Sequence, residues 1–179
     1  MPKRPPKKSR PALEEYLGQV GDLLSHPKVQ GLSRFPQHGR VDCLRHSLHV
    51  SYTSWRLCRA MGLNGRAAAR GGLLHDFFLY DWHEGTPGGG LHAFTHPRAA
   101  AENAARYFEL SDRERDVVLR HMWPLTVRPP RYMESWVVAF VDKYYCLAEV
   151  LAPSGLGRME GLMQAARESG ERKPLRAGI

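Results

Sequence analysis

Almost every segment of this chain repeats its apolar residues at helical spacing, and no segment sustains the alternation of apolar and polar residues that marks a half-buried strand. Helix signals agree with this periodicity. Asn64 can cap one helix, and Ser111 with Glu114 forms a capping box for another. The pattern predicts an all-α protein with helices over residues 11–25, 40–61, 66–78, 95–110, 111–123, 132–151 and 159–168.

The length of 179 residues predicts one domain with a sizeable core. We expect a disordered basic tail over 1–11, a helical body over 12–157, and a C-terminal helix with a polar tail over 158–179. The longest apolar run, 136–141, is too short to span a membrane, and no apolar signal core follows the basic start. These features predict a soluble, cytoplasmic protein.

The net charge of +8 is concentrated near the ends of the chain. Residues 1–10 supply +5 and residues 158–179 supply +2, which leaves +1 for the body between them. This distribution indicates a basic tail rather than a basic binding surface. Loose contact of the tail with nucleic acid or anionic lipid is one interpretation, and a solubilising extension is the other. The three cysteines, Cys43, Cys58 and Cys146, form no CxxC pair and are expected to be small buried thiols.

Several polar residues occupy positions where helical periodicity predicts core. His46 lies on a mostly apolar stripe, whereas His49 shares a polar stripe and is expected at the surface. His121 shares the face of two valines. Asp142 lies on a helix that is apolar nearly all round, which predicts a central buried helix. A carboxylate there costs several kcal/mol unless a positive group neutralises it.

These misplaced residues have a common explanation if they surround metal. Two first-row divalent ions would suit four imidazoles and two carboxylates, here His46, His75, Asp76, His96, His121 and Asp142. They come from five segments, which a helical bundle can bring together. The alternative is that each is a separately hydrogen-bonded polar group of the core.

The ordered pattern of these residues resembles the HD-domain metal-dependent phosphohydrolase superfamily, over residues 38–150. The segments His46-Ser47-Leu48-His49-Val50, Gly72-Leu73-Leu74-His75-Asp76, His96-Pro97, His121 and Val141-Asp142-Lys143 carry the resemblance. It implies a helical bundle of the HD-domain type. His46, His75, Asp76 and Asp142 would hold one ion. His96 and His121 would hold a second, with Asp76 bridging. The sequence departs from the cyclic-di-nucleotide phosphodiesterases after His121, where Met122-Trp123-Pro124-Leu125 replaces their His-Glu and Gly-Tyr-Pro signature.

The resemblance makes hydrolysis of a phosphate ester, by a water activated between two ions, the leading functional hypothesis. The substrate would be a small phosphorylated molecule, with nucleotides among the candidates. Asp76, Lys143 and His38 are the candidate catalytic residues, with His38 as a proton donor. Lys143, Arg45, Trp82 and His83 are the candidate substrate-binding residues. Further side chains considered for phosphate or nucleobase contact are Lys28, Arg128 and Trp123.

Two other classes of function fit the same residues. Some HD-domain proteins with four histidines and two aspartates use a mixed-valence di-iron centre as an oxygenase, and the ligand set does not separate the two chemistries. Iron that consumes oxygen together with a substrate would favour that class, whereas iron, manganese or a similar ion would serve a hydrolase. The third class is a non-catalytic, metal-bound binding module.

Overall fold

The computed structural model describes residues 10–38, 41–87, 89–151 and 160–171, and over these ranges the fold is all-α, as predicted. The helices are α1 (Arg10–Leu24), α2 (Pro27–Gln30), a 3-10 helix (Gly31–Arg34), α3 (Cys43–Ala60), α4 (Gly65–Leu74), α5 (His92–Tyr107), α6 (Asp112–Arg120), α7 (Met133–Leu151) and α8 (Glu160–Glu171). None of the helices in this part of the chain is long and apolar enough to cross a membrane.

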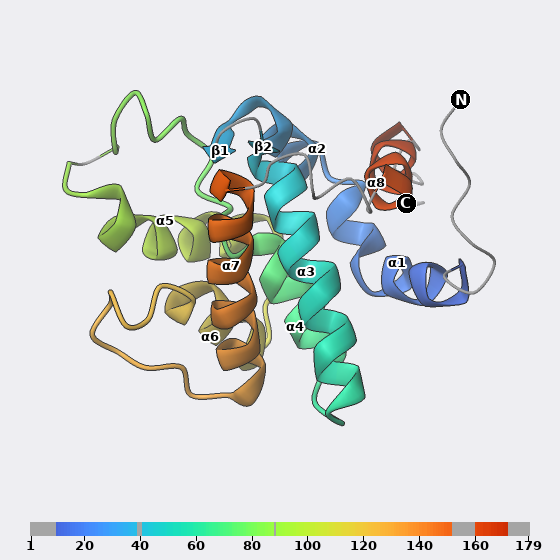
Figure 1. Ribbon diagram of the computed structural model, residues 1–179. Coiled ribbons are helices and arrows are strands. Elements are labelled where there is room, and N and C mark those ends of the chain that lie inside the picture. The colour runs from blue at the N-terminus through green and yellow to red at the C-terminus, as the bar shows by residue number, and fades with distance from the viewer. Residues whose placement is uncertain (1–9, 39–40, 88, 152–159, 172–179) are drawn as a thin grey trace, which may run out of the picture.

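The helices form a bundle around α3 and α4. Figure 1 shows α7 beside α3, with α5 and α6 on one side of this pair and α1 with α8 on the other. Tyr16, Leu48, Trp55 and Phe77 are large side chains buried in the main core. Residues Leu162 and Ala166 of α8 are buried in the same core. The C-terminal helix therefore packs onto the body.

Two glycines of α4 allow close packing against α3 and α6. A Cβ atom built on Gly72 of α4 would lie 3.0 Å from Ser51 Cα of α3. One built on Gly71 would lie 2.7 Å from Val117 Cβ of α6. Two successive glycines therefore let α4 approach both neighbours, and this brings the C-terminal end of α4 close to α3 and α6.

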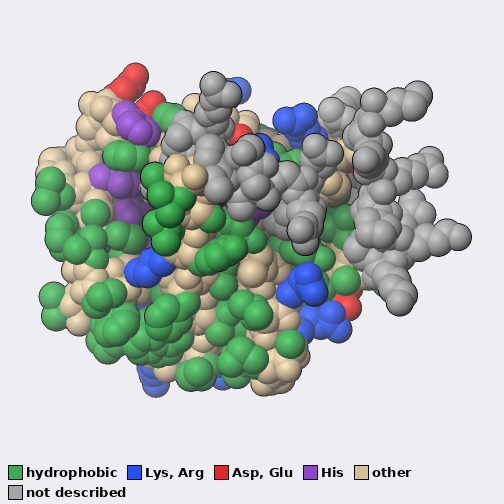
Figure 2. Space-filling model, in the orientation of Figure 1, with side chains coloured by type: hydrophobic (Ala, Val, Ile, Leu, Met, Phe, Trp, Pro, Cys, Tyr) green, Lys and Arg blue, Asp and Glu red, His purple; other side chains and the backbone are tan. Residues whose placement is uncertain are grey.

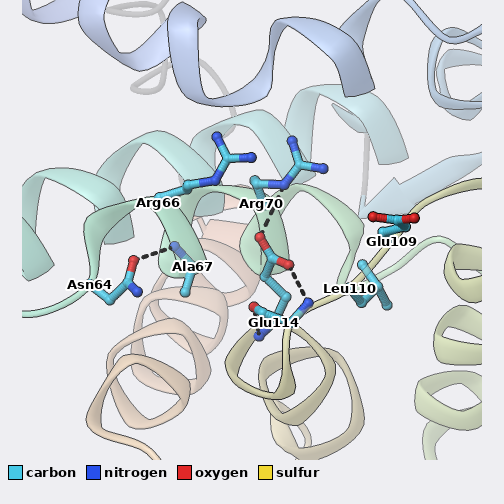
Figure 3. A pocket seen from close by; sticks show the side chains of 8 residues that line it. Asn64, Arg66, Ala67, Arg70, Glu109, Leu110 and Glu114 are labelled. Atoms are coloured by element: carbon cyan, nitrogen blue, oxygen red, sulfur yellow. Dashed lines mark hydrogen bonds and ion pairs between the residues drawn. The ribbon is translucent and has the colours of Figure 1, made fainter.

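Buried polar contacts connect the start of α6 to the bundle (Figure 3). The predicted capping box is present, because Ser111 Oγ accepts from Glu114 N and Glu114 Oε2 accepts from Ser111 N. Glu114 Oε1 also lies 3.0 Å from Arg70 Nε of α4. Asn64 caps α4 as predicted. These residues border a pocket of about 490 Å³ that contains none of the six predicted metal ligands.

Several predicted boundaries are wrong. Antiparallel strands β1 (Pro36–His38) and β2 (Val41–Asp42) form a two-stranded sheet where no strand was predicted. Helix α3 begins at Cys43 rather than residue 40, because Asp42 is its N-cap. Helix α4 ends at Leu74, four residues early.

Helix α5 begins at His92, three residues before the predicted start, and contains Pro97. The His92 ring is stacked on Trp82, and its Nδ1 lies 3.1 Å from Tyr80 Oη. These contacts hold the added first turn, and they connect segments that local sequence patterns do not relate. At the other end of the chain, α1 begins at Arg10, so residues 10 and 11 of the predicted tail are helical. Proline is compatible with a first helical turn. Residues 1–9 lie outside the described ranges.

The prediction that α7 is buried on all sides is wrong. One face packs on α3 and α6, with Val138, Val141, Asp142 and Glu149 buried. The opposite face exposes large apolar side chains, including Phe140 and Leu147. The sequence shows that the helix is apolar, but apolar character alone does not show how many neighbours cover it. The three cysteines are free, with Cys43 and Cys58 buried and Cys146 partly buried, in agreement with the prediction of small thiols.

Candidate metal centre

The fold brings all six predicted metal ligands together. His46 comes from the first half of α3, His75 and Asp76 from the C-terminal end of α4, and His121 from the C-cap of α6. Two helices supply the remaining pair, His96 of α5 and Asp142 of α7. All six side chains are buried. They form two adjacent groups, and within each group the three ligand atoms lie within 4.8 Å of one another. The first group is His46, His75 and Asp142, and the second is Asp76, His96 and His121.

In the first group, one carboxylate oxygen faces two imidazoles. Asp142 Oδ1 lies 3.1 Å from His46 Nε2 and 3.4 Å from His75 Nε2. In the second group, Asp76 Oδ1 lies 3.3 Å from His96 Nε2 and 3.6 Å from His121 Nε2. Each group therefore combines two imidazole nitrogens with one carboxylate oxygen.

Asp76 lies between the two groups. Its Oδ1 faces His96 and His121, whereas its Oδ2 lies 3.3 Å from His75 Nε2 and 4.0 Å from His46 Nε2. Gln37 of β1 donates a hydrogen bond to the same Oδ2, at 2.5 Å. The carboxylate thus presents a different oxygen to each group, which is the orientation that a bridging ligand needs.

The imidazoles are oriented by hydrogen bonds on the far side of each ring. The Nδ1 atoms of His75, His96 and His121 donate to backbone carbonyls at 2.8 to 2.9 Å. His46 Nδ1 donates instead to the carboxylate of Glu149, 2.9 Å from Oε2 and 3.1 Å from Oε1. A carbonyl or carboxylate on Nδ1 holds that nitrogen protonated and turns Nε2 toward the centre. All four rings therefore present Nε2 to the cluster.

The charges of the cluster shift its pKa values strongly. Burial lowers the pKa of His46, but the carboxylates of Asp142 and Glu149 outweigh burial and raise it to about 9. The pKa of His75 is raised well above its ordinary value against burial, chiefly by Asp76 and Asp142. Burial and the neighbouring histidines His75 and His96 lower the pKa of His121 to about 3. Without metal, protons on His46 and His75 thus balance part of the negative charge.

The donor set fits divalent transition-metal ions. His75 Nε2 is buried and makes no hydrogen bond, although carboxylate oxygens lie near it. The Nε2 atoms of His96 and His121 are 2.8 Å apart, and both rings already donate through Nδ1. A cation between the Nε2 atoms of His96 and His121 would satisfy lone pairs that otherwise face one another. Imidazole and carboxylate together suit iron, manganese and zinc.

Of the candidate catalytic and substrate-binding residues, some lie beside the cluster and others do not. Lys143 Nζ donates to His121 O at 2.7 Å and to Ala139 O, so its ammonium lies beside the second group. Trp82 is stacked on His92, whose ring is stacked on His96, so the loop after α4 reaches the edge of the centre. His83 is exposed and bonded to Asp81.

The other candidates have no described contact with the cluster. Arg45 lies on α3 next to His46 in sequence, and its buried Nε makes no hydrogen bond. Lys28 and Arg128 are exposed. Trp123 packs edge-on against Trp136, as expected for a tryptophan in packing. His38 belongs to β1, and its side chain lies outside the described residues.

The prediction that His49 is a surface residue is wrong. Its side chain is only 1% exposed, next to the Tyr145 ring and 4.0 Å from Glu149 Oε1. Burial, with the positive charge of Arg45 nearby, lowers its pKa to about 4. The polar stripe that suggested exposure is covered by α7 at this position, which is a tertiary contact.

Sequence reasoning missed two residues that contact the cluster, Gln37 and Glu149. Glu149 has a local signal, because it follows Asp142 by seven residues and therefore shares its helix face. Gln37 has none, since the small sheet that positions it was not predicted. No protein-family model, curated protein or solved structure matches the chain. The function is therefore inferred from the geometry of the site and from the sequence motifs described above.

Proposed function

We propose that this protein is a metal-dependent hydrolase of phosphate esters that uses a dinuclear histidine–aspartate centre. The observation that carries the proposal is Asp76, whose two carboxylate oxygens face two different groups of ligands. A cluster of separately satisfied polar groups has no need of this arrangement. The resemblance to HD-domain phosphohydrolases supports the same function.

Two ions held by these six residues would supply an activated water and positive charge for phosphoryl oxygens. Neighbouring residues of the chain orient the ligands. Gln37 fixes the Asp76 carboxylate, and Glu149 fixes the ring of His46. Burial of all six ligands keeps bulk water away and strengthens each electrostatic contact.

Two residues favour a phosphorylated substrate at this centre. Lys143 places an ammonium group beside His121, from where it can neutralise a phosphate oxygen. Trp82 offers a partly exposed ring next to the His92–His96 stack, a surface on which a flat substrate group can lie. We therefore propose Lys143 and Trp82 as the substrate-binding residues, and a nucleotide as one candidate substrate.

Turnover assays on a panel of substrates test this function. Metal-depleted protein would be reloaded with Mn²⁺ or Fe²⁺ and assayed on phosphomonoesters, phosphodiesters and nucleotides. We expect hydrolysis of at least one class, which frees phosphate from a monoester or a monoester and an alcohol from a diester. Asp142→Asn should lower this turnover by more than about a hundredfold, since the neutral amide is a much weaker ligand. The matched control is Asp112→Asn, which makes the same change at an exposed position on α6.

Oxygen uptake, measured on the same samples, separates the hydrolase from the oxygenase. A hydrolase should hydrolyse its phosphate ester at the same rate with and without oxygen. Full turnover in Asp142→Asn would contradict the proposed site. Substrate-dependent oxygen consumption by the iron-loaded protein, without hydrolysis of any phosphate ester, would contradict the proposed reaction.

A further inference from the structure

The outer face of α7 carries a continuous row of exposed apolar residues. Phe140, Tyr144, Leu147 and Leu151 are 61%, 64%, 61% and 73% exposed. Met133, in the first turn of the helix, is exposed as well, and Val137 between them is partly buried. Figure 2 shows hydrophobic side chains gathered on the face of the molecule where Figure 1 places α7. We call this row the α7 seam.

The spacing of the α7 seam is that of a helix-pairing surface. Its members, Met133, Val137, Phe140, Tyr144, Leu147 and Leu151, follow one another at intervals of four, three, four, three and four residues. Apolar residues with this 3.5-residue repeat form the contact line between two packed helices. A surface helix that pairs with no partner needs only one apolar stripe, which faces the core of its own domain. A second apolar row on the outer face has no such role.

The exposed apolar area is large enough for a stable interface. Taking about 150–250 Å² for a whole large side chain, the exposed members of the seam and the neighbouring Val150 together expose roughly 700 Å². The largest apolar patch of an ordinary monomer covers about 300–600 Å². A standard protein–protein interface buries about 800 Å² of each partner. The seam is therefore close to what one partner contributes to a stable complex.

The charges of α7 favour a partner with an equally uncharged surface. Its carboxylates, Glu134, Asp142 and Glu149, are buried on the inner face. Its one cationic group, the Lys143 ammonium, donates to two backbone carbonyls. A charged partner would therefore find no complementary group along the seam. A second copy of this chain presents the same apolar row, and the six seam positions carry no charged residue.

Segments of the chain outside the described ranges do not match the seam. Residues 1–9 contain Met1 as their only large apolar side chain, residues 152–159 contain Leu156 and Met159, and residues 172–179 contain Leu175 and Ile179. These five apolar residues are spread over three segments and are separated by charged, proline, serine and glycine residues. They have neither the number nor the spacing to cover six seam positions.

We propose that the protein is a homodimer in which the α7 seams of two copies pack against each other. The contact is self-complementary, because each copy contributes the same face to a two-fold interface. It also places the interface on the helix whose inner face carries Asp142 and Glu149, so that dimerisation holds a ligand-bearing helix on both sides. The proposal does not depend on the identity of the reaction.

The molar mass of the wild-type protein and of seam variants tests the dimer. Light scattering or sedimentation equilibrium should give twice the chain mass of 20.3 kDa for the wild type. Leu147→Glu should raise the dissociation constant about a hundredfold or more, since two carboxylates would be brought together in an apolar contact. Phe140→Ser serves as a second seam variant without an added charge and should also weaken the dimer.

The matched control is Leu91→Glu, at a leucine that is 71% exposed ahead of α5. It adds the same charge and should leave the dimer intact. Circular dichroism of each variant checks that the helices remain folded. A monomeric wild type, including one that binds a different protein through α7, would overturn the proposal. A dimer that persists unchanged in folded Leu147→Glu and Phe140→Ser would overturn it as well.

Discussion

At the level of single residues, the six predicted ligands were identified because polar side chains at buried positions require partners. The structure shows that this signal is reliable for His46, His75 and Asp142, which lie together in the core. It failed for His49, whose local pattern is polar although α7 covers it. The metal-binding role of the ligands stays a prediction, whereas their proximity is an observation.

Glu149 gives the sharpest prediction at this scale. Its carboxylate holds His46 Nδ1, and removal of such a partner typically weakens metal binding by 10 to 100-fold. We expect Glu149→Gln to lower the affinity for Mn²⁺ by about that factor while the fold is kept, because the amide oxygen still accepts a weaker hydrogen bond. Calorimetric titration of metal-depleted protein measures the change.

The control for Glu149→Gln is Glu134→Gln, which alters another buried carboxylate of α7. Glu134 accepts from Asn64 N and from Arg113, far along the helix from the cluster. This variant should lose stability but keep the affinity of the wild type for metal. Equal metal affinities in the wild type and Glu149→Gln would show that Glu149 does not support His46.

At the level of elements, helix positions could be predicted from periodicity and caps, but several ends could not. The capping box at Ser111 and the Asn64 cap are local and were predicted correctly. The start of α5 depends on stacking between His92 and Trp82, which lie ten residues apart. The outer face of α7 was misassigned because burial depends on neighbours rather than on the helix's own residues.

The close packing of α3 against α4 predicts that a side chain at Gly72 destabilises the protein. Gly72→Ala should destabilise the protein by about 1–3 kcal/mol, because its Cβ would press on the backbone of Ser51 and force the two helices apart. The same displacement separates His46 from His75, so metal affinity should fall as well. Urea unfolding, together with metal titration, measures both effects.

Gly18→Ala is the matched control within another helix. Gly18 is exposed on α1, and no atom lies within 4 Å of its Cβ position. Alanine there should stabilise the protein by about 0.5–1 kcal/mol, since it restricts the unfolded chain and fits the helix. If Gly72→Ala proved as stable as Gly18→Ala, the α3–α4 packing described above would be wrong.

At the level of the whole molecule, the all-α class was predictable because almost every segment has the same helical period. The assembly of the centre was predictable only as a requirement that buried polar groups find partners. The contacts within the centre could not be predicted in this way. Asp76 lies between the two groups and Gln37 bonds to Asp76 Oδ2, and both contacts depend on how β1 packs against the bundle.

The protonation of the centre predicts how metal binding depends on pH. With a pKa of about 9 for His46 and a strongly raised pKa for His75, both imidazoles carry protons at pH 7 in the metal-free protein. Metal must displace them, so binding at pH 7 should release about two protons per chain, and affinity should rise with pH. Calorimetry in two buffers of different ionisation enthalpy counts the protons.

The raised pKa of His46 also makes the stability of the metal-free fold decrease as the pH rises. The raised pKa of His46 means that its protonation stabilises the metal-free fold. This stabilisation is fully present below the unfolded pKa of about 6.5 and is lost as the pH rises through about 9. The difference in Tm between metal-loaded and metal-free protein should therefore widen between these pH values. A constant difference, with no proton release, would contradict the assigned protonation of His46 and His75.

The central claim, a dinuclear centre built by six buried side chains, is tested most directly by counting metal. The wild type, depleted with a chelator and then dialysed against Mn²⁺ or Fe²⁺, should contain about two ions per chain by elemental analysis and should unfold at a higher temperature than the metal-free protein. His96→Ala and His121→Ala should each retain about one ion, because both histidines belong to the second group. Wild-type protein that stays folded, takes up no metal and shows the same Tm with and without it would contradict the account.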